Sequence, residues 1–111
     1  MTATTIDPTT FAELQATTGA EFVVELVETF AEEAPQMLAE IRSGHAAKDA
    51  ERFRRAAHSL KSNSNTFGAV RLAEMARTLE LGGLPGSSAP LDAVAAELDA
   101  TLAALKTLAR G

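Results

Sequence analysis

The 111-residue chain has two histidines that could carry chemistry, His45 and His58, and no cysteine. The lack of cysteine also excludes a disulfide framework and a thiolate metal site. His45 lies in a Ser-Gly-His segment, which we interpret as a solvated turn. His58 lies in a segment whose apolar residues recur every three or four positions, and on a helix it would point about 135° away from the centre of that stripe. We therefore expect His58 to face solvent.

Basic residues surround His58 at helical spacing. Arg54 and Lys61 lie one helical turn before and after it, with Arg55 close by, so a chain of net charge −5 carries a local positive patch. A neutral, exposed imidazole is a competent nucleophile, and neighbouring cations would receive the oxygens of an arriving phosphoryl group. The residues thus favour phosphoryl chemistry at His58.

Two further polar residues, Ser62 and Asn65, share the face of His58. Ser62 is small, which leaves room for another protein to approach the ring. The alternative, from the residues alone, is an ordinary exposed histidine on a polar helix face.

Motifs of other chemistries are missing. The chain has no His-Glu-x-x-His pair and no phosphate-binding glycine loop. The glycine-rich stretch 82–86 has no preceding strand and no following Lys-Ser/Thr, so we interpret it as an interhelix loop. Without a nucleotide-binding motif, the chain is not expected to phosphorylate itself from ATP. No carboxylate cluster next to His58 could hold a metal ion, so no metal site is predicted.

The rest of the sequence predicts the helices that must position His58. Alanine, leucine and glutamate dominate, which favours helix throughout. Asp7-Pro8 is typical of a helix start and predicts a short helix to about Gln15. Longer helices are predicted over about 20–42, 46–66 and 69–81, and from Ser88, a candidate cap, onward.

Proline and glycine mark the expected bends and ends of these helices. Pro35 should kink the second helix, and the segment from Ser43 to His45 should end it. Gly68 is a candidate left-handed residue after the third helix. Short connections favour antiparallel neighbours. The expected fold is therefore all-α, an antiparallel four-helix bundle with a short extra N-terminal helix.

The apolar stripes of these helices define the predicted core. Its expected members are Val23, Leu26, Phe30, Ala34, Met37, Ile41, Ala50, Phe53, Ala57, Leu60, Ser64, Phe67, Leu72, Met75, Ala76, Leu79, Leu91, Val94, Leu98, Leu102, Leu105 and Leu108.

Length and composition limit the number of domains and the class of protein. The chain suits a single domain, residues 1–111, with a core over about 6–108 and an interhelix loop at 84–90. A hydrophobic fraction of 46% excludes whole-chain disorder, and no apolar run is long enough to span a membrane. The start of the sequence lacks the pattern of a signal peptide, so a cytoplasmic location is expected. An acidic balance without Trp or Tyr argues against nucleic-acid binding.

One segment resembles the signature of histidine-containing phosphotransfer (HPt) domains. It reads Ala57-His58-Ser59-Leu60-Lys61-Ser62-Asn63-Ser64-Asn65-Thr66-Phe67-Gly68-Ala69, followed by Leu72 and Leu79-Glu80. The family pattern is His-x-x-Lys-Gly/Ser, then a small residue, a glycine ten after the histidine, and a leucine four further on. The stretch from Phe30 to Leu38 is also similar to the family's second helix, and the resemblance extends from about Ile6 to Leu108.

The resemblance implies a four-helix bundle that relays phosphoryl groups between aspartates of response-regulator receiver domains. His58 would be the phosphorylated residue, and Lys61 would help to neutralise the phosphoryl group, together with Arg54. Ser62 stands at a position that must stay small for partner approach, and Gly68 matches the glycine of the following turn. Glu80 stands where some members have a glutamine that orients the histidine.

The partners and cofactors are also implied by the resemblance. Receiver domains and a hybrid sensor kinase are the expected partners, met through the surface around His58 and apolar residues of the first two helices. Mg²⁺ is expected on the receiver alone, with no cofactor on this chain. The protein would be a monomeric phosphocarrier without kinase activity of its own.

Two alternatives stay open. The first is a docking adaptor of the same fold that is not phosphorylated, although the presence of both His58 and Lys61 argues against it. The second is an HPt domain embedded in a larger kinase, at the end of a hybrid sensor kinase or the front of a chemotaxis-type kinase. A metal-binding four-helix protein is disfavoured, because its Glu-x-x-His pairs are absent.

Overall fold

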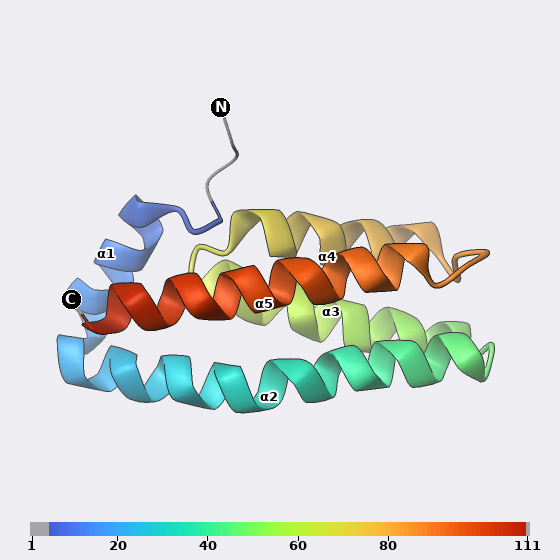
Figure 1. Cartoon of the computed structure of the whole chain (residues 1–111), viewed down its shortest axis with the longest axis horizontal. Coiled ribbons are helices and arrows are strands. Elements are labelled where there is room, and N and C mark those ends of the chain that lie inside the picture. The colour runs from blue at the N-terminus through green and yellow to red at the C-terminus, as the bar shows by residue number, and fades with distance from the viewer. Residues whose placement is uncertain (1–4, 111) are drawn as a thin grey trace.

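A computed structural model describes residues 5–110 of the chain, and within that range it contains five helices and no strand. These are α1 (Pro8–Thr18), α2 (Ala20–Ala46), α3 (Ala50–Thr66), α4 (Val70–Gly82) and α5 (Ala89–Arg110). The four longer helices run side by side, and α1 lies across one end of them (Figure 1). Helix α3 packs against α2 and α4, while α5 closes the bundle against α2 and α4. The predicted four-helix bundle with an extra N-terminal helix is confirmed.

Helix α1 begins as predicted and is fixed to the turn between α3 and α4. The Asp7 carboxylate accepts a hydrogen bond from the backbone N–H of Thr9, and Pro8 takes the first helical position. The backbone N–H of Asp7 donates to the carbonyl of Gly68 at 2.7 Å. The cap of α1 therefore also anchors this helix to the bundle.

Helix α2 is longer than predicted. It continues through Gly44 and His45 to Ala46, so the expected end at the Ser-Gly-His segment is wrong. Gly44 is buried, and a Cβ on it would lie 2.8 Å from the backbone nitrogen of Phe53. This glycine serves close helix packing rather than termination. Pro35 lies inside the uninterrupted helix, which excludes a restart there and leaves the kink a prediction.

Helix α3 begins later than predicted, at Ala50 instead of Ala46. The Asp49 side chain caps it by accepting from the backbone N–H of Arg52 at 3.1 Å. Ala50 is exposed, so its place in the predicted core was wrong, because it lies at the very start of the helix. Gly68 follows the helix with φ of 75°, which confirms the predicted left-handed residue.

The connection between α4 and α5 is slightly shorter than the predicted loop, since α5 already starts at Ala89. Ser88, the predicted cap, directly precedes this helix, and its carbonyl accepts a hydrogen bond from the backbone N–H of Asp92 at 2.9 Å. The hydroxyl of Ser87 accepts a further one from the backbone N–H of Ala89, at 3.3 Å. Within residues 5–110, no helix is long and apolar enough to cross a membrane.

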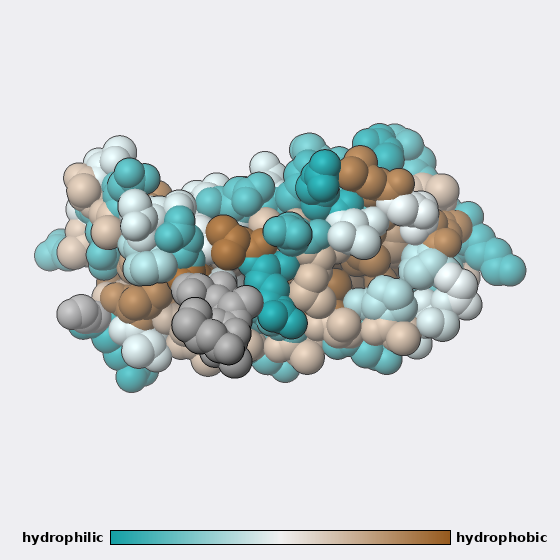
Figure 2. Space-filling view, turned by 90° about the horizontal axis from the view of Figure 1, so that it is seen from above, coloured by the Kyte–Doolittle hydropathy of each residue, from teal (hydrophilic) through white to brown (hydrophobic). Residues whose placement is uncertain are grey.

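Most predicted core positions are buried in one continuous cluster. Leu108 is exposed, and Val27, Ala73 and Thr101 are buried without having been predicted. Four predicted members lie at the edge of the core and are only partly buried: Leu26, Met37, Met75 and Leu102. Polar and apolar residues are interspersed on the face in Figure 2, and α4 and α5 form a shallow hollow lined by Met75, Thr78, Leu79, Pro90, Ala93 and Val94.

Candidate functional site

His58 projects from the outer face of α3. The core side of this helix carries Phe53, Ala57 and Leu60, which are fully buried. The His58 side chain is 55% exposed, which confirms the orientation expected from the helical phase. The core thus fixes the rotation of α3 and, with it, the direction of the imidazole.

Glu80 of α4 connects His58 to Lys61. Its Oε2 lies 2.7 Å from His58 Nδ1, and its Oε1 lies 2.8 Å from Lys61 Nζ. The Glu80 side chain is only 11% exposed. The hydrogen bond from Lys61, followed by that from His58, holds the pKa of the Glu80 carboxyl below its usual range. An ionised carboxylate can only accept, so Nδ1 carries a proton, and a neutral ring then presents an unprotonated Nε2.

The arginines near His58 differ in how they are held. Arg54 is turned toward Glu51 on its own helix, with Nη2 2.8 Å from Oε2 and Nε 3.4 Å from Oε1. The hydrogen bond from Arg54 lowers the pKa of the Glu51 carboxyl. Arg55 is 70% exposed, and its nearest carboxylate contact is 4.0 Å away, at Glu51. The structure therefore gathers His58, Lys61 and Glu80, and turns Arg54 to another partner.

Comparison with known proteins assigns the chain to a family. A model of the Hpt domain matches residues 25–107 of the chain. The chain belongs to the Hpt domain family. It also matches the crystal structure of histidine-containing phosphotransfer protein B (HptB) from Pseudomonas aeruginosa PAO1, with 28% sequence identity and a TM-score of 0.76. That match covers 98% of this chain and 94% of the other. A comparison with curated protein sequences gives no match.

Membership in the Hpt family fixes the general function. The protein is a phosphocarrier of a phosphorelay, in which Hpt domains interact with receiver domains and kinases of two-component systems. The family match and the similarity in fold thus confirm the resemblance to histidine phosphotransfer domains.

The remaining predicted site residues of this Hpt domain fall in two places. Ser62 and Asn65 are exposed on α3, and Asn65 lines a shallow hollow with Lys61. Gly68 is buried instead, and a Cβ on it would lie 2.9 Å from Cβ of Thr10. Gly68 therefore shapes the turn beside α1.

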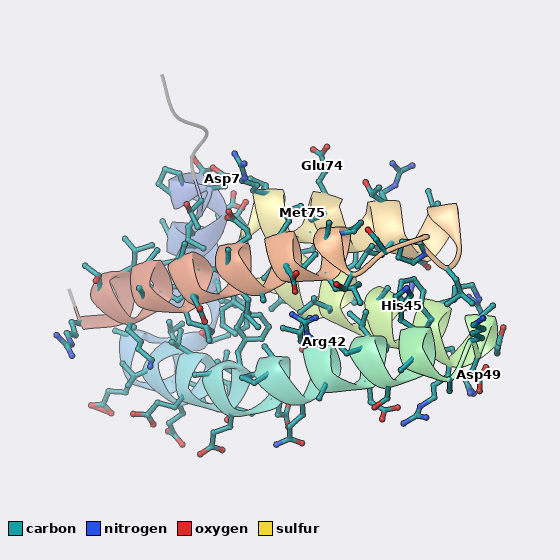
Figure 3. All side chains as sticks on the ribbon, turned by 45° about the vertical axis from the view of Figure 1, so that its right-hand side comes forward. Asp7, Arg42, His45, Asp49, Glu74 and Met75 are labelled. Atoms are coloured by element: carbon teal, nitrogen blue, oxygen red, sulfur yellow. The ribbon has the colours of Figure 1, made fainter. Side chains whose placement is uncertain are left out.

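His45 is not the solvated turn histidine that the sequence indicated. It lies in the last turn of α2 and is partly buried, with Nε2 2.9 Å from the carbonyl oxygen of Pro85. Its ring centroid is 6.3 Å from that of Phe53. Figure 3 shows His45 at the end of the Hpt bundle where α2 meets the α4–α5 connection. Spacing in the sequence could not reveal a contact with a segment 40 residues away.

Proposed function

We propose that His58 is the residue of this Hpt domain that carries the phosphoryl group, received from the aspartyl phosphate of a receiver domain. The observation that carries the proposal is the contact of Nδ1 with the ionised Glu80, which leaves Nε2 of an exposed ring as the nucleophile. The other histidine of the chain, His45, uses its Nε2 to hold a backbone carbonyl.

These groups account for every bond and proton of the transfer step. The lone pair of His58 Nε2 attacks phosphorus, the N–P bond forms, and the bond from phosphorus to the carboxyl oxygen breaks. The electron pair of that bond returns to the receiver's aspartate. The proton on Nδ1 stays in place, so the ring becomes positively charged, and the carboxylate of Glu80 faces that charge at 2.7 Å. Such transition states are loose, and the protein contributes mainly positioning and charge.

Lys61 offsets the negative charge that Glu80 brings to the site. A bare carboxylate beside the histidine would repel the phosphoryl group, but Lys61 Nζ lies 2.8 Å from Oε1 of Glu80. Lys61 therefore makes an orienting glutamate compatible with an anionic substrate. Arg54 joins the site in this proposal only by leaving Glu51, with which it now makes two hydrogen bonds.

The receiver would dock on the face around Ser62 and Asn65, which are both exposed. Phe22 is an exposed large apolar residue of α2 and is the proposed apolar contact from the first two helices. We expect the domain to act as a monomer, since the face of His58 must stay open to its partner.

The proposal includes the source of the phosphoryl group. We propose that the chain has no kinase activity of its own, because its sequence carries no nucleotide-binding motif. The Mg²⁺ of the transfer would be bound by the receiver's acidic pocket, and this chain would need no cofactor. The relay would operate in the cytoplasm, where kinases obtain phosphoryl groups from ATP.

A labelling experiment tests the proposal. A panel of pre-phosphorylated receiver domains is mixed with wild type, His58→Gln and His45→Gln, and acid-labile label on the Hpt domain is measured. We expect label on wild type and His45→Gln, and none on His58→Gln. Label on His58→Gln, or its loss from a folded His45→Gln, would contradict the assignment. Receivers that bind but never transfer would favour the docking adaptor.

A further inference from the structure

The orientation of the His58 ring indicates the side from which the phosphoryl group approaches the nitrogen that attacks it. Nδ1 faces Glu80, which belongs to α4. Nε2 lies on the opposite edge of the imidazole, so it faces away from α4, toward the side of α3 that meets α2. The incoming phosphorus must lie in line with Nε2. It therefore arrives over the groove between α2 and α3.

A shallow hollow of about 260 Å³ occupies that groove. Its lining residues are Met37, Glu40, Arg52, Arg55, Ala56 and Ser59. Arg55 lies one helical turn before His58, and such pairs are neighbours on a helix surface. The hollow thus places a guanidinium on the side of the ring to which Nε2 points.

Three of the four cations of α3 are already paired with carboxylates. Arg54 and Lys61 are held by Glu51 and Glu80, each at 2.8 Å. Within the hollow, Arg52 makes two hydrogen bonds to Glu40, at 2.7 and 3.0 Å, and hydrogen bonding to Glu40 is the main cause that raises the Arg52 pKa. Each would have to give up these contacts to bind another anion.

Arg55 differs from these three cations. Its guanidinium lies 4.0 Å from Glu51, beyond hydrogen-bond distance, and 70% of the side chain is exposed. The nearer arginine, Arg54, already occupies the same carboxylate oxygen of Glu51 at 2.8 Å. Arg55 can therefore turn toward a new anion at little cost, with the forked geometry that suits phosphoryl oxygens.

We propose that Arg55 binds the phosphoryl group on Nε2 of His58, and that the receiver's aspartate enters over the hollow between α2 and α3. The inference rests on the proposed role of His58 and assigns the direct phosphoryl contact to a residue outside the His-x-x-Lys motif. While the N–P bond forms and the bond from phosphorus to the aspartate oxygen breaks, Arg55 donates two N–H groups to the phosphoryl oxygens. Lys61 meanwhile remains with Glu80.

Four variants of the full chain test this assignment against one phosphorylated receiver. They are Arg55→Ala, Arg55→Lys, His58→Gln and, as the control, Arg71→Ala, which changes an exposed arginine of α4 that pairs with Glu97 away from the hollow. Circular dichroism verifies the fold of each, and the affinity for the unphosphorylated receiver is measured separately. The readout is the transfer rate constant at saturating receiver, which separates phosphoryl binding from docking.

We expect Arg55→Ala to lower this rate constant by about 10- to 100-fold, the range for loss of a charged hydrogen bond in the transition state. Arg55→Lys should recover part of the rate, because it keeps the charge but not the fork. Arg71→Ala should stay within about threefold of wild type, since it removes an ion pair of an exposed arginine outside the hollow.

Three results would overturn the inference: equal rates for Arg55→Ala and wild type, equal losses for Arg55→Ala and Arg71→Ala, or a loss confined to receiver affinity. Failure of the proposed function has a different signature. Label on His58→Gln would refute the role of His58 itself, whatever the arginine variants do.

Discussion

The two histidines of this Hpt domain lie on adjacent helices and each binds one distant segment, but their partners differ in charge. His45 of α2 is partly buried, and its Nε2 lies 2.9 Å from the carbonyl oxygen of Pro85. His58 of α3 is exposed, and its Nδ1 lies 2.7 Å from the carboxylate of Glu80. A neutral carbonyl fixes a ring in place, whereas a carboxylate also stabilises positive charge that develops on it.

The comparison teaches that the partner, and not the residue type, decides which histidine can react. His45 holds the end of α2 to the α4–α5 connection, and its Nε2 is committed to that task. His58 commits Nδ1 and keeps Nε2 for a substrate. His45 joins two segments of the bundle, and His58 is the proposed nucleophile.

The same contrast applies to the small residue that accompanies each histidine. Ser62 is exposed one turn after His58, where a small side chain leaves space for a partner. Gly44 is buried next to His45, where it leaves space for the backbone of Phe53. Enlarging each residue should therefore damage a different property of the protein.

The largest expected effect is on transfer, from Ser62→Trp. The indole would cover the approach to His58, so we expect the rate of transfer from a receiver to fall on the order of 100-fold or more, since a steric clash opposes docking. Transfer kinetics and circular dichroism check this. Ser62→Ala is the control, because alanine keeps the small size of serine. Wild-type transfer in a folded Ser62→Trp would remove this face from the interface.

The next effect is on stability, from Gly44→Ala. A Cβ there would lie 2.8 Å from the backbone nitrogen of Phe53 and 3.0 Å from its Cα, so α2 and α3 must separate. Overpacking costs about 1 to 3 kcal/mol, and the better helix propensity of alanine returns up to about 1 kcal/mol. We expect a net loss of about 1 to 2 kcal/mol in the free energy of unfolding, measured by urea denaturation.

Gly82→Ala is the control for this prediction, because a Cβ at Gly82 meets nothing within 4 Å. It should cost no stability, and both glycine variants should transfer phosphoryl groups at the wild-type rate. A Gly44→Ala protein as stable as Gly82→Ala would show that α2 and α3 can separate without a loss in the free energy of unfolding.

The fold was largely predictable because apolar spacing alone fixes which face of each helix is buried, as at Phe53 and Leu60. The errors come from local signals that tertiary packing overrides. Gly44 is a terminator by propensity, but its lack of a side chain lets two helices meet. The start of α3 was misplaced because the cap at Asp49 was overlooked.

The direction of His58 was predictable from helical spacing, whereas its pairing with Glu80 was indicated only by the family resemblance. The helical phase of α3 is enough to turn His58 outward. Its contact with Glu80 joins residues 22 positions apart on two helices, which spacing on one helix cannot reveal. Helical spacing makes both Arg54 and Arg55 neighbours of Glu51, but which of them binds the carboxylate depends on side-chain rotamers and requires the structure.

The smallest expected effect is a loss of folding stability at acidic pH, caused by protonation of Glu80 next to His58. Hydrogen bonds from Lys61 and then His58 lower the pKa of Glu80, so these contacts stabilise the folded state wherever Glu80 is ionised. For a carboxyl with a lowered folded pKa, that stability is fully present above the unfolded value of about 4.3 and is lost as pH falls through the folded pKa.

We therefore expect wild type to be more stable than Glu80→Gln near neutral pH, with the difference shrinking as pH falls below about 4.3. Urea denaturation of both proteins over a pH series measures it. Glu40 and Glu51, whose pKa values are also lowered by arginine hydrogen bonds, are present in both proteins and cancel in the difference. A difference that does not change with pH would mean that Glu80 holds Lys61 and His58 as a neutral acceptor, and its carboxylate charge would then have no part in preparing the histidine.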